Sequence, residues 1–304
     1  MITDRIMKNI RYSLKNSGNM KILILGSEGM AGRYINNFLP LSWSPDKCPE
    51  IIGLNRDKFN AFNADAYTLI DLFNKYRISK GHTIINCIGT IKPRVDELGK
   101  YNAIIVNSVL PHILSEVVSY IGVHLIHITT DCVFSGKRPN PYGPREKGNY
   151  AEDDPHDAED VYGKTKSLGE QEYATIIRTS IIGEEKGRVQ RSLLQWVIDN
   201  KGKSINGYTN HYWNGITCLR LTQIIGQIIS TGTYWSGVKH VYSHIVSKYE
   251  LVRAISNIYN LDITVVKTQT PVIDRTLRST REDIIFDQYD IIDDIKKQKE
   301  SLLP

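Results

Sequence analysis

Short apolar runs alternate with stretches of helical periodicity through the first two thirds of the chain. A short continuous apolar run between turn residues is typical of a strand buried in a parallel sheet. Such runs predict strands at residues 21–25, 50–54, 83–88, 124–129 and 175–178. Helical spacing predicts helices at residues 29–39, 67–76, 102–120 and 160–172. Pro111 should kink or break the third of these helices near its start. The alternation predicts an α/β protein whose doubly wound parallel sheet carries helices on both faces.

From about residue 184 onward the pattern becomes irregular. Helical periodicity predicts three further helices, at residues 190–199, 219–230 and 247–259. Ser247 and Glu250 form a capping box at the start of the last one. We therefore expect a flexible extension at residues 1–19 and an α/β domain at 20–183. Residues 184–304 should form mainly a smaller, discontinuous substrate-binding lobe, with some segments returning to the first domain.

Composition excludes several classes of protein. The chain of 304 residues is 41% hydrophobic and 23% charged, as is ordinary for a globular protein, and no run of about 18 apolar residues predicts a membrane span. The four cysteines form no Cys-x-x-Cys pair, which favours reduced thiols and a cytoplasmic location. The net charge of +5 comes from basic residues interleaved with acidic ones, so no nucleic-acid partner is expected.

The sequence contains no recognisable metal-binding pattern. The eight histidines form no His-x-x-x-His pair, and the acidic segment at residues 152–160 lacks the spacing of a calcium loop. We expect no metal, and we expect the acidic segment to be a solvated lid or connection.

Three glycines, Gly26, Gly29 and Gly32, follow the first predicted strand and open the first predicted helix. Gly26 permits a tight turn, Gly29 lets backbone approach a pyrophosphate, and Gly32 allows close packing of helix on strand. The free N–H groups of the helix then face the anion. The strand, turn and helix predict a Rossmann-type dinucleotide-binding domain, in which Ser27 and Met30 also contact the cofactor.

The end of the second predicted strand bears on the choice of cofactor. NAD-selective sites usually carry an acidic residue there, which binds the ribose 2′-hydroxyl. This chain has Asn55 followed by Arg56, which suits a 2′-phosphate, although Asp57 one residue later argues the other way. The sequence favours NADP over NAD.

Tyr162 and Lys166 are four residues apart and share one face of a predicted helix. A nearby ammonium group favours the ionised form of a tyrosine and lowers its pKa, so this tyrosine could protonate a ketone oxygen as hydride arrives. Thr130 ends the fourth predicted strand and could bind the same oxygen. Thr130, Tyr162 and Lys166 are therefore the candidate catalytic set, and the last two should also contact the cofactor.

At this point the chain resembles a known family. The glycine turn, residues 129–134 (Thr-Thr-Asp-Cys-Val-Phe) and residues 162–166 (Tyr-Gly-Lys-Thr-Lys) look like the dTDP-4-dehydrorhamnose reductases and related sugar-nucleotide reductases of the extended short-chain dehydrogenase class. The likeness extends over residues 21–281 and includes residues 86–89, 106–107 and 177–180. Residues 86–92 and 271–275 are similar to the branch that acts on UDP-2-acetamido-2,6-dideoxy-hexuloses.

The resemblance implies NADPH-dependent reduction of the C4 ketone of a nucleotide-linked 4-keto-6-deoxy sugar, in deoxysugar biosynthesis. It assigns the chemistry to Thr130, Tyr162 and Lys166, and places Cys87 to Gly89 beside the nicotinamide. The sugar is of the UDP-2-acetamido-2,6-dideoxy-hexulose or the dTDP/UDP-4-dehydrorhamnose type. The residues expected to bind the nucleotide sugar are Lys92, Asn107, Arg188, Trp213, Asn214 and Arg275.

Cys132 departs from the rhamnose reductases, which usually carry tyrosine at that position. Enzymes that combine epimerisation with reduction are similar to this chain in having cysteine there. A thiol has an ordinary pKa of about 8.5, so both of its protonation states are accessible near neutrality, and it could move the proton on C3 beside the ketone. The second acid or base would be Lys186, Arg188 or His211. Alternatively, Cys132 is a small buried packing residue.

Two other functions stay open. The regulatory subunit of methionine adenosyltransferase resembles the same family, so a catalytically silent, NADP-binding regulatory subunit is the alternative to an enzyme. Reduction of a different, non-nucleotide ketone is a third reading. In either enzymatic case, the family likeness implies a homodimer that pairs through the helices at residues 102–120 and 160–172.

Overall fold

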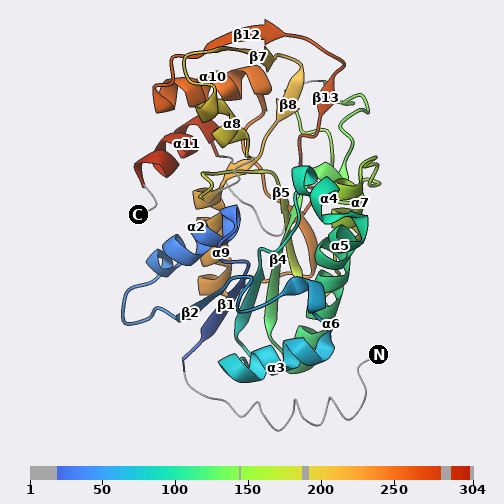
Figure 1. The fold of residues 1–304 in the computed structure, drawn as a ribbon, viewed down its shortest axis with the longest axis vertical. Coiled ribbons are helices and arrows are strands. Elements are labelled where there is room, and N and C mark those ends of the chain that lie inside the picture. Colours follow the sequence, from blue (N-terminus) through green and yellow to red (C-terminus); the bar gives the residue numbers. More distant parts are fainter. Residues whose placement is uncertain (1–18, 144, 187–191, 282–288, 302–304) are drawn as a thin grey trace. The chain divides into compact units, whose positions relative to one another are not determined.

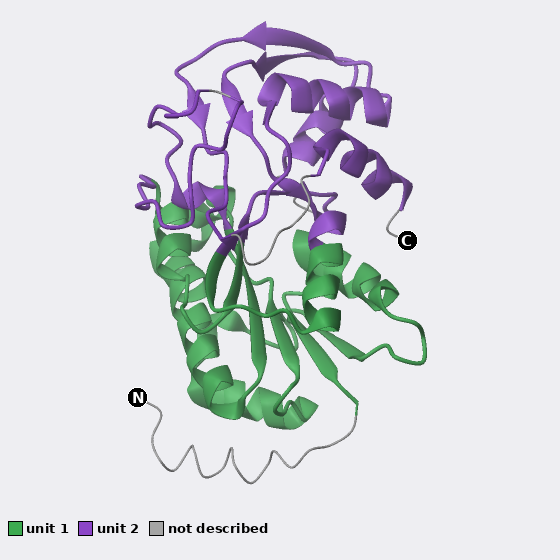
Figure 2. Cartoon of the chain, turned by 180° about the vertical axis from the view of Figure 1, so that it is seen from behind, with its two compact units in different colours: residues 1–129, 160–177, 222–238 green, residues 130–159, 178–221, 239–304 purple. Residues whose placement is uncertain are grey.

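The computed structural model describes residues 19–143, 145–186, 192–281 and 289–301. The chain forms two compact units (Figure 2). Unit 1 comprises residues 1–129, 160–177 and 222–238, and unit 2 comprises residues 130–159, 178–221 and 239–304. The predicted flexible extension lies outside the described residues except for Asn19, as does Arg188. The predicted domain boundary at residues 183 and 184 stays a prediction.

A six-stranded sheet forms the centre of unit 1 (Figure 1), and the last residues of some of its strands belong to unit 2. Its order is β10-β5-β4-β3-β1-β2, and the β1–β2, β1–β3 and β3–β4 pairs are parallel. The strands are β1 (Lys21–Leu25), β2 (Glu50–Leu54), β3 (Thr83–Asn86), β4 (His124–Thr130), β5 (Thr175–Thr179) and β10 (Gly237–His240). The predicted α/β class and Rossmann-type sheet are confirmed, with β10 as a strand that the apolar pattern did not reveal.

Helices cover both faces of this sheet, α2 and α9 on one side and α3, α5, α6 and α7 on the other (Figure 1). Their bounds are α2 (Met30–Phe38), α3 (Ala66–Tyr76), α5 (Lys100–Ile104), α6 (Leu110–Ile121), α7 (Val161–Leu168) and α9 (Cys218–Thr231). Short 3₁₀ turns η1 (Leu39–Ser42) and η2 (Ala61–Asn63) follow α2 and precede α3. Lys92 and Arg94 lie in a further helix, α4 (Lys92–Leu98), rather than in a loop.

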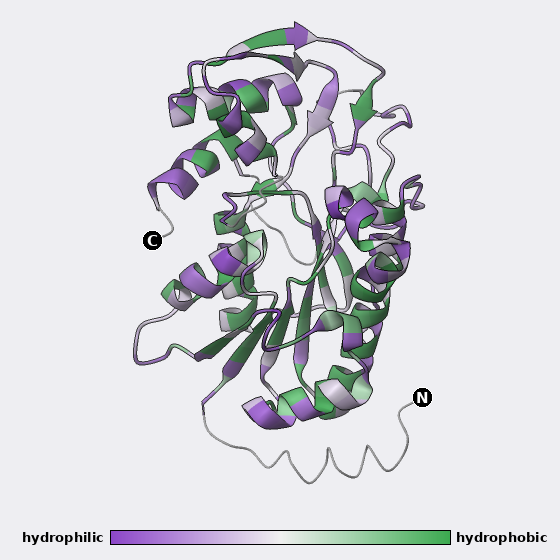
Figure 3. Ribbon diagram, viewed as in Figure 1, coloured by the Kyte–Doolittle hydropathy of each residue, from purple (hydrophilic) through white to green (hydrophobic). Residues whose placement is uncertain are grey.

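Alternate residues of the strands enter separate cores because successive side chains of a strand point to opposite faces. Leu23, Ile84, Leu125 and Ile176, from four neighbouring strands, are almost fully buried in one core, which also contains Leu114 of α6. Burial of one such side chain stabilises the fold by about 1.5–3 kcal/mol. Figure 3 shows hydrophobic residues concentrated along these strands. The continuous apolar runs of the sequence therefore reflect burial on both faces of the sheet.

The long helix predicted at residues 102–120 is interrupted. A π-helical segment, η3 (Ile105–Val109), separates α5 from α6, and Pro111 stands in the first turn of α6, where its missing N–H is tolerated. The continuous stretch Lys100–Ile121, 22 residues long, is apolar enough to cross a membrane by length and composition alone. More than half of its most apolar window is buried, and Leu110, Leu114 and Val118 belong to the core of unit 1, so it is a core helix here.

In the described residues of unit 2, short strands and helices surround a second core. Its helices are α8 (Leu193–Asp199), α10 (Lys248–Tyr259) and α11 (Ile291–Glu300), and the predicted capping box of Ser247 and Glu250 opens α10. Its strands are β6 (Ile181–Ile182), β7 (Ser204–Tyr208), β8 (His211–Trp213), β9 (Ile216–Thr217), β11 (Val246–Ser247), β12 (Thr264–Thr268) and β13 (Ile273–Asp274). They pair as β11-β8-β13, β12-β7 and β6-β9. Trp213, Leu251 and Ile295 share the core.

The prediction that residues 152–160 form a solvated segment is wrong for Glu152, whereas Asp153, Asp157 and Glu159 are exposed. Glu152 is 5% exposed, and its carboxylate accepts hydrogen bonds from the His240 N–H (2.9 Å), the Ser279 hydroxyl (2.6 Å) and the Thr280 N–H (2.9 Å). Asp157 accepts hydrogen bonds from the backbone and the hydroxyl of Ser135. The Glu152 carboxylate replaces its hydration with these protein donors, because a buried carboxylate without partners is strongly destabilising. The segment is a structural brace inside unit 2.

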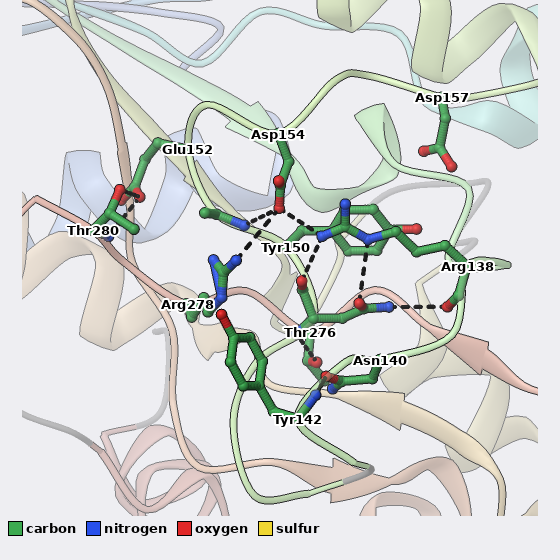
Figure 4. A network of polar contacts seen from close by, with 12 residues as sticks. Arg138, Asn140, Tyr142, Tyr150, Glu152, Asp154, Asp157, Thr276, Arg278 and Thr280 are labelled. Carbon is green, nitrogen blue, oxygen red and sulfur yellow. Dashed lines mark hydrogen bonds and ion pairs between the residues drawn. The ribbon is translucent and has the colours of Figure 1, made fainter.

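Arginine side chains complete this brace (Figure 4). Arg138 lies 4.0 Å from the Tyr150 ring centre and donates to the Asn149 carbonyl (2.6 Å) and to Asp154 (2.5 Å). Asn149 in turn donates to the Asp274 carbonyl (3.1 Å). The network ties residues 138–154 to residues 274–280, the stretch that contains Arg275.

The fold predicts different outcomes for two alanine substitutions in the glycine turn. A Cβ at Gly32 would lie 2.1 Å from the Gly26 carbonyl oxygen, whereas a Cβ at Gly29 would lie 3.4 Å from it. We expect Gly32→Ala to lower the free energy of unfolding by about 1–3 kcal/mol, even though alanine gains about 1 kcal/mol of helix propensity. Gly29→Ala should cost less than about 1 kcal/mol, the effect of a poorer N-cap. Urea unfolding of both variants measures this, and equal midpoints would contradict the steric argument.

Candidate active site

The loops after β1 and β3 meet where the strand order reverses, which is where open α/β sheets bind ligands. The Gly26 N–H donates to the Leu54 carbonyl of β2 (2.9 Å), and the Cys87 N–H donates to the Leu25 carbonyl of β1 (3.0 Å). A Cβ built on Gly26 would lie 3.0 Å from the Ile88 side chain, so the two loops are in contact. This edge of the sheet carries most of the predicted cofactor-binding residues.

The glycine turn has the conformation and the space that an anion site needs. Gly26 has a φ of 80°, which disfavours other residues, and Gly32 packs directly on the Gly26 carbonyl. Gly29 is the N-cap of α2, and no side chain caps that helix. The turn leaves the first N–H groups of α2, which begins at Met30, available to a phosphate group. The residues fit the diphosphate of a dinucleotide.

A carboxylate that sequence reasoning missed is hydrogen-bonded to the residue that follows β2. The Asn55 amide donates to Glu28 Oε1 (2.9 Å), and the Arg56 guanidinium lies over the Phe62 ring, 5.6 Å from its centre. Glu28 stands inside the glycine turn, next to Gly29, and that position was the available signal. A cation from Arg56 and a carboxylate from Glu28 therefore lie at the region predicted to bind the ribose 2′ position.

The loop after β3 is fixed by Asn107 in the π-helical segment. Its carbonyl oxygen accepts from the Thr90 N–H (2.8 Å), and its amide donates to the Thr90 carbonyl (3.2 Å) and the Thr165 hydroxyl (3.0 Å). Asn107 is completely buried, which makes it a positioning residue, and its predicted contact with substrate stays a prediction. A Cβ at Gly89 would lie 3.4 Å from the Asn107 Oδ1 and 3.6 Å from the Lys166 amine.

Cys87 lies in the same loop, and burial raises the pKa of its thiol to about 12.

Helix α7 presents Tyr162 and Lys166 from a well-capped start. The Asp160 side chain accepts a hydrogen bond from the Gly163 N–H (2.8 Å). It also accepts one from the amine of Lys92 (2.8 Å), a residue predicted to bind the substrate. The Lys166 amine donates to the Ile128 carbonyl of β4 (2.9 Å), and burial lowers its pKa to about 8. Ile128 is two residues before Thr130, so Lys166 is bonded to the strand that ends in the candidate catalytic threonine.

At the start of unit 2, Thr130 caps the turn η4 (Asp131–Val133). Its hydroxyl donates to Asp131 Oδ1 (3.1 Å) and accepts from the Cys132 N–H (3.1 Å). The pKa of the Cys132 thiol is raised to about 12, mainly by burial and secondly by the negative charge of Asp131. This differs from the expectation of a thiol near its ordinary pKa, because the surroundings of Cys132 disfavour the thiolate. Cys132 is a protonated thiol at neutral pH.

Two cations of unit 2 lie near the turn η4. The Arg275 Nε donates to the Phe134 carbonyl (2.9 Å), and the Lys248 amine lies over the Trp213 ring, 4.9 Å from its centre. Both cations interact electrostatically with Asp131 and Cys132. Sequence reasoning found Trp213 and Arg275 but missed Lys248, whose only signal was its place after the N-cap Ser247.

Two further candidates from the sequence, Asn214 and His211, differ in burial. Asn214 is buried, and its amide group exchanges two hydrogen bonds with the Leu277 backbone (2.7 and 2.9 Å). His211 of β8 hydrogen-bonds Thr270 (2.7 Å) and stacks on Tyr208, and burial lowers its pKa. In the part of the chain that the structure describes, no cluster of histidine, cysteine and acidic side chains could hold a metal ion.

The raised pKa of Cys132 predicts its reactivity. Alkylation requires the thiolate, so the rate of Cys132 alkylation by iodoacetamide should rise about tenfold per pH unit from pH 8 to 10 without levelling off. Mass spectrometry of the peptide that contains Cys132 measures the rate, with the partly exposed Cys48 as an internal reference for reagent quality. A plateau below pH 9 would show that the thiol ionises near its ordinary pKa.

Comparison with known proteins gives a consistent picture. Residues 20–272 match the family described as RmlD substrate binding domain. Methionine adenosyltransferase 2 subunit beta of Xenopus tropicalis is 26% identical over 280 residues, which cover 86% of this chain and 77% of that protein. A probable dTDP-4,6-dihydroxy-2-methyloxan-3-one 4-ketoreductase of Streptomyces antibioticus is 26% identical over 188 residues, covering 60% of this chain and 58% of that protein.

A solved dTDP-4-dehydrorhamnose reductase of Bacillus anthracis, in complex with NADP, has the same fold. It superposes with a TM-score of 0.73 at 19% identity and covers 93% of this chain and 99% of its own. The resemblance inferred from the motifs is confirmed by these matches. The chain belongs to the RmlD substrate binding domain family.

Proposed function

We propose that this protein is an NADPH-dependent reductase of the C4 ketone of a nucleotide-linked 4-keto-6-deoxy sugar. One observation carries the proposal: Tyr162 and Lys166 lie four residues apart on α7, and the Lys166 amine is hydrogen-bonded to β4 two residues before Thr130. A protein that only binds a dinucleotide has no physical need for all three groups. The reductases and the ketoreductase among its relatives support the same activity.

The cofactor would be held in unit 1. Its diphosphate suits the turn of Gly26, Ser27, Gly29, Met30 and Gly32, and the uncapped start of α2 supplies N–H donors. The residues proposed for the 2′-phosphate are Asn55 and Arg56, and those proposed for the nicotinamide side are Cys87, Gly89, Tyr162 and Lys166. When bound, NADPH supplies the hydride that reduces the ketone.

Tyr162 is the proposed proton donor to the ketone oxygen. Lys166 is held in place by the Ile128 carbonyl, and its ammonium form, which lies on the same helical face, favours loss of the tyrosine proton. Thr130, whose hydroxyl donates to Asp131 in this structure, would turn to the ketone oxygen and help to hold it. These groups stabilise the negative charge that develops on that oxygen.

The nucleotide sugar would be held by Lys92, Asn107, Arg188, Trp213, Asn214 and Arg275. The cation of Arg275 suits the diphosphate and the indole of Trp213 suits the apolar face of the sugar ring. The sugar belongs to the UDP-2-acetamido-2,6-dideoxy-hexulose or the dTDP/UDP-4-dehydrorhamnose type, and the reaction serves deoxysugar biosynthesis in the cytoplasm. Exposed Tyr101, Ile104 and Leu168 on α5 and α7 support the proposed homodimer.

Coupled epimerisation at C3 is the second part of this proposal. Cys132 follows Thr130 by two residues, so its thiol belongs to the turn that begins at the catalytic threonine. A protonated thiol is suited to return a proton to carbon, and a different group must then remove one.

A catalytically silent regulatory subunit is the competing function. It is favoured by relatives named methionine adenosyltransferase 2 subunit beta, which match 85–86% of this chain. The two functions differ in one measurable respect. The enzyme oxidises NADPH when given a UDP- or dTDP-linked 4-keto-6-deoxy sugar, and mass spectrometry finds the reduced sugar. A silent subunit binds NADPH and consumes none.

The proposed acid can be tested with a matched pair of variants. We expect Tyr162→Phe to bind NADPH normally and to lose about 10²–10⁴-fold in kcat, since positioned proton transfer contributes that much. Tyr173→Phe is the control, because Tyr173 is 75% exposed beyond the end of α7. Its kcat should equal that of the parent protein. Near-parental turnover by Tyr162→Phe would remove Tyr162 from the mechanism.

The charges of Arg56 and of Glu28, which accepts a hydrogen bond from the neighbouring Asn55, predict the choice of cofactor. The parent protein should have a higher kcat/KM with NADPH than with NADH, because Arg56 offers a cation to the 2′-phosphate. Glu28→Gln should widen that preference, since it removes a negative charge that Asn55 holds at 2.9 Å. Arg56→Ala should narrow it. The hypothesis fails if neither substitution changes the ratio of the two kcat/KM values.

A further inference from the structure

Lys248 is a cation that no step of the proposed reduction uses. It is the first residue of α10, and its amine stands over the Trp213 ring, 4.9 Å from the ring centre. Its amine forms no hydrogen bond or ion pair with the residues that the structure describes, whereas Lys166 is bonded to the Ile128 carbonyl. The Lys248 amine is therefore available to a ligand of unit 2.

The groups that face Lys248 come from three other elements. Asp131 and Cys132 belong to η4, Arg275 directly follows β13, and His211 lies in β8. Burial lowers the pKa of Lys248 to about 8, Asp131 and Cys132 oppose that shift, and Arg275 adds to it. The start of a helix, where the dipole disfavours a cation, acts in the same direction. A substantial share of the amine is thus neutral near pH 8.

This cluster contains the two groups that an epimerisation requires, a deprotonated base and a protonated acid. A base must remove the proton from the carbon beside a ketone, and an acid must return one. Cys132 keeps its proton at neutral pH, so it is suited to the second step and not to the first. We propose that Lys248, beside the Cys132 thiol and the Trp213 ring, is the base that removes the C3 proton of the ketosugar.

The proton balance of this step closes within the cluster. The neutral Lys248 amine takes the C3 proton, the C–H bond breaks, and its electron pair forms an enolate whose oxygen is the former C4 ketone oxygen. The Cys132 S–H bond breaks as its proton reaches the opposite face of C3, and the ketone is restored. Lys248 is then an ammonium and Cys132 a thiolate, and a proton that passes from the ammonium to the thiolate resets both. No oxidant or reductant is needed.

This inference rests on the proposed function, and deuterium exchange tests it apart from reduction. The protein is incubated in D₂O with NADP⁺ and UDP- or dTDP-linked 4-keto-6-deoxy sugar, and deuterium at C3 is measured by mass spectrometry and NMR. The base is the deprotonated amine, so the exchange rate should rise with pH and level off above about pH 8. A thiolate base with a pKa of about 12 would instead give a rate that still rises at pH 10.

Two variants identify the base. Lys248→Arg keeps a cation that can stack on Trp213 but never becomes neutral, so exchange should fall at least about 100-fold. Lys267→Arg is the matched control, because Lys267 is an exposed lysine of unit 2 that also lies over a ring, 5.4 Å from the centre of Tyr249. It should exchange at the parental rate. Thermal unfolding and NADPH binding, measured on both variants, show that the loss in Lys248→Arg does not come from misfolding.

Cys132→Ser separates the two roles. Lys248 would still remove the proton and return deuterium from its own ammonium, so exchange should persist while formation of the C3 epimer is lost. Loss of exchange in Cys132→Ser together with parental exchange in Lys248→Arg would reverse the assignments and overturn the proposal.

NADPH oxidation with the same ketosugars is followed in parallel. Turnover of NADPH without any exchange in the parent protein overturns the role of Lys248 and leaves the proposed reductase intact. Failure of both reactions with all of the ketosugars removes the proposed function, and the inference with it.

Discussion

The buried amide of Asn107 is the interaction on which the cofactor side of the site depends. It links the backbone of Thr90, in the loop after β3, to the hydroxyl of Thr165 in α7. Tyr162 and Lys166 lie on that helix, so one side chain sets the position of the proposed acid relative to the loop that is proposed to line the nicotinamide. The amide is fully buried, and each partner left unsatisfied would cost about 1–3 kcal/mol. The wide turn of the π-helical segment is where the chain accommodates this residue.

Two lysines share a lowered pKa of about 8 for the same reason, burial, and yet differ in what they can do. Lys166 has its amine fixed by the Ile128 carbonyl, which holds it as an electrostatic group beside α7. Lys248 has an aromatic ring and ionisable neighbours, but its amine has no hydrogen bond among the described residues, so the amine can turn towards a ligand. Hydrogen bonding, more than the pKa itself, distinguishes a positioning lysine from a candidate base.

Patterns that are local in sequence predicted the fold and part of the site. The strands from β1 to β5 followed from apolar runs, and the glycine turn and the Tyr162–Lys166 pair from spacing alone. The prediction failed where the determining partner is remote. Glu152 looked solvated, because its partners His240 and Thr280 lie far along the chain. Lys248 looked like an ordinary helix residue, because its neighbours come from η4 and β8. Strand β10 (Gly237–His240) contains lysine and histidine, which removed the apolar signal.

The chain passes between the two units after residues 129, 159, 177, 221 and 238. During synthesis on the ribosome, the edge strand β10 of the unit 1 sheet emerges only after the first two segments of unit 2. Unit 1 therefore cannot complete its sheet as an early, independent folding event, and no single truncation yields it as a continuous fragment. The two units must therefore mature together, and a fusion or an excision placed at the boundary of one unit will interrupt the other.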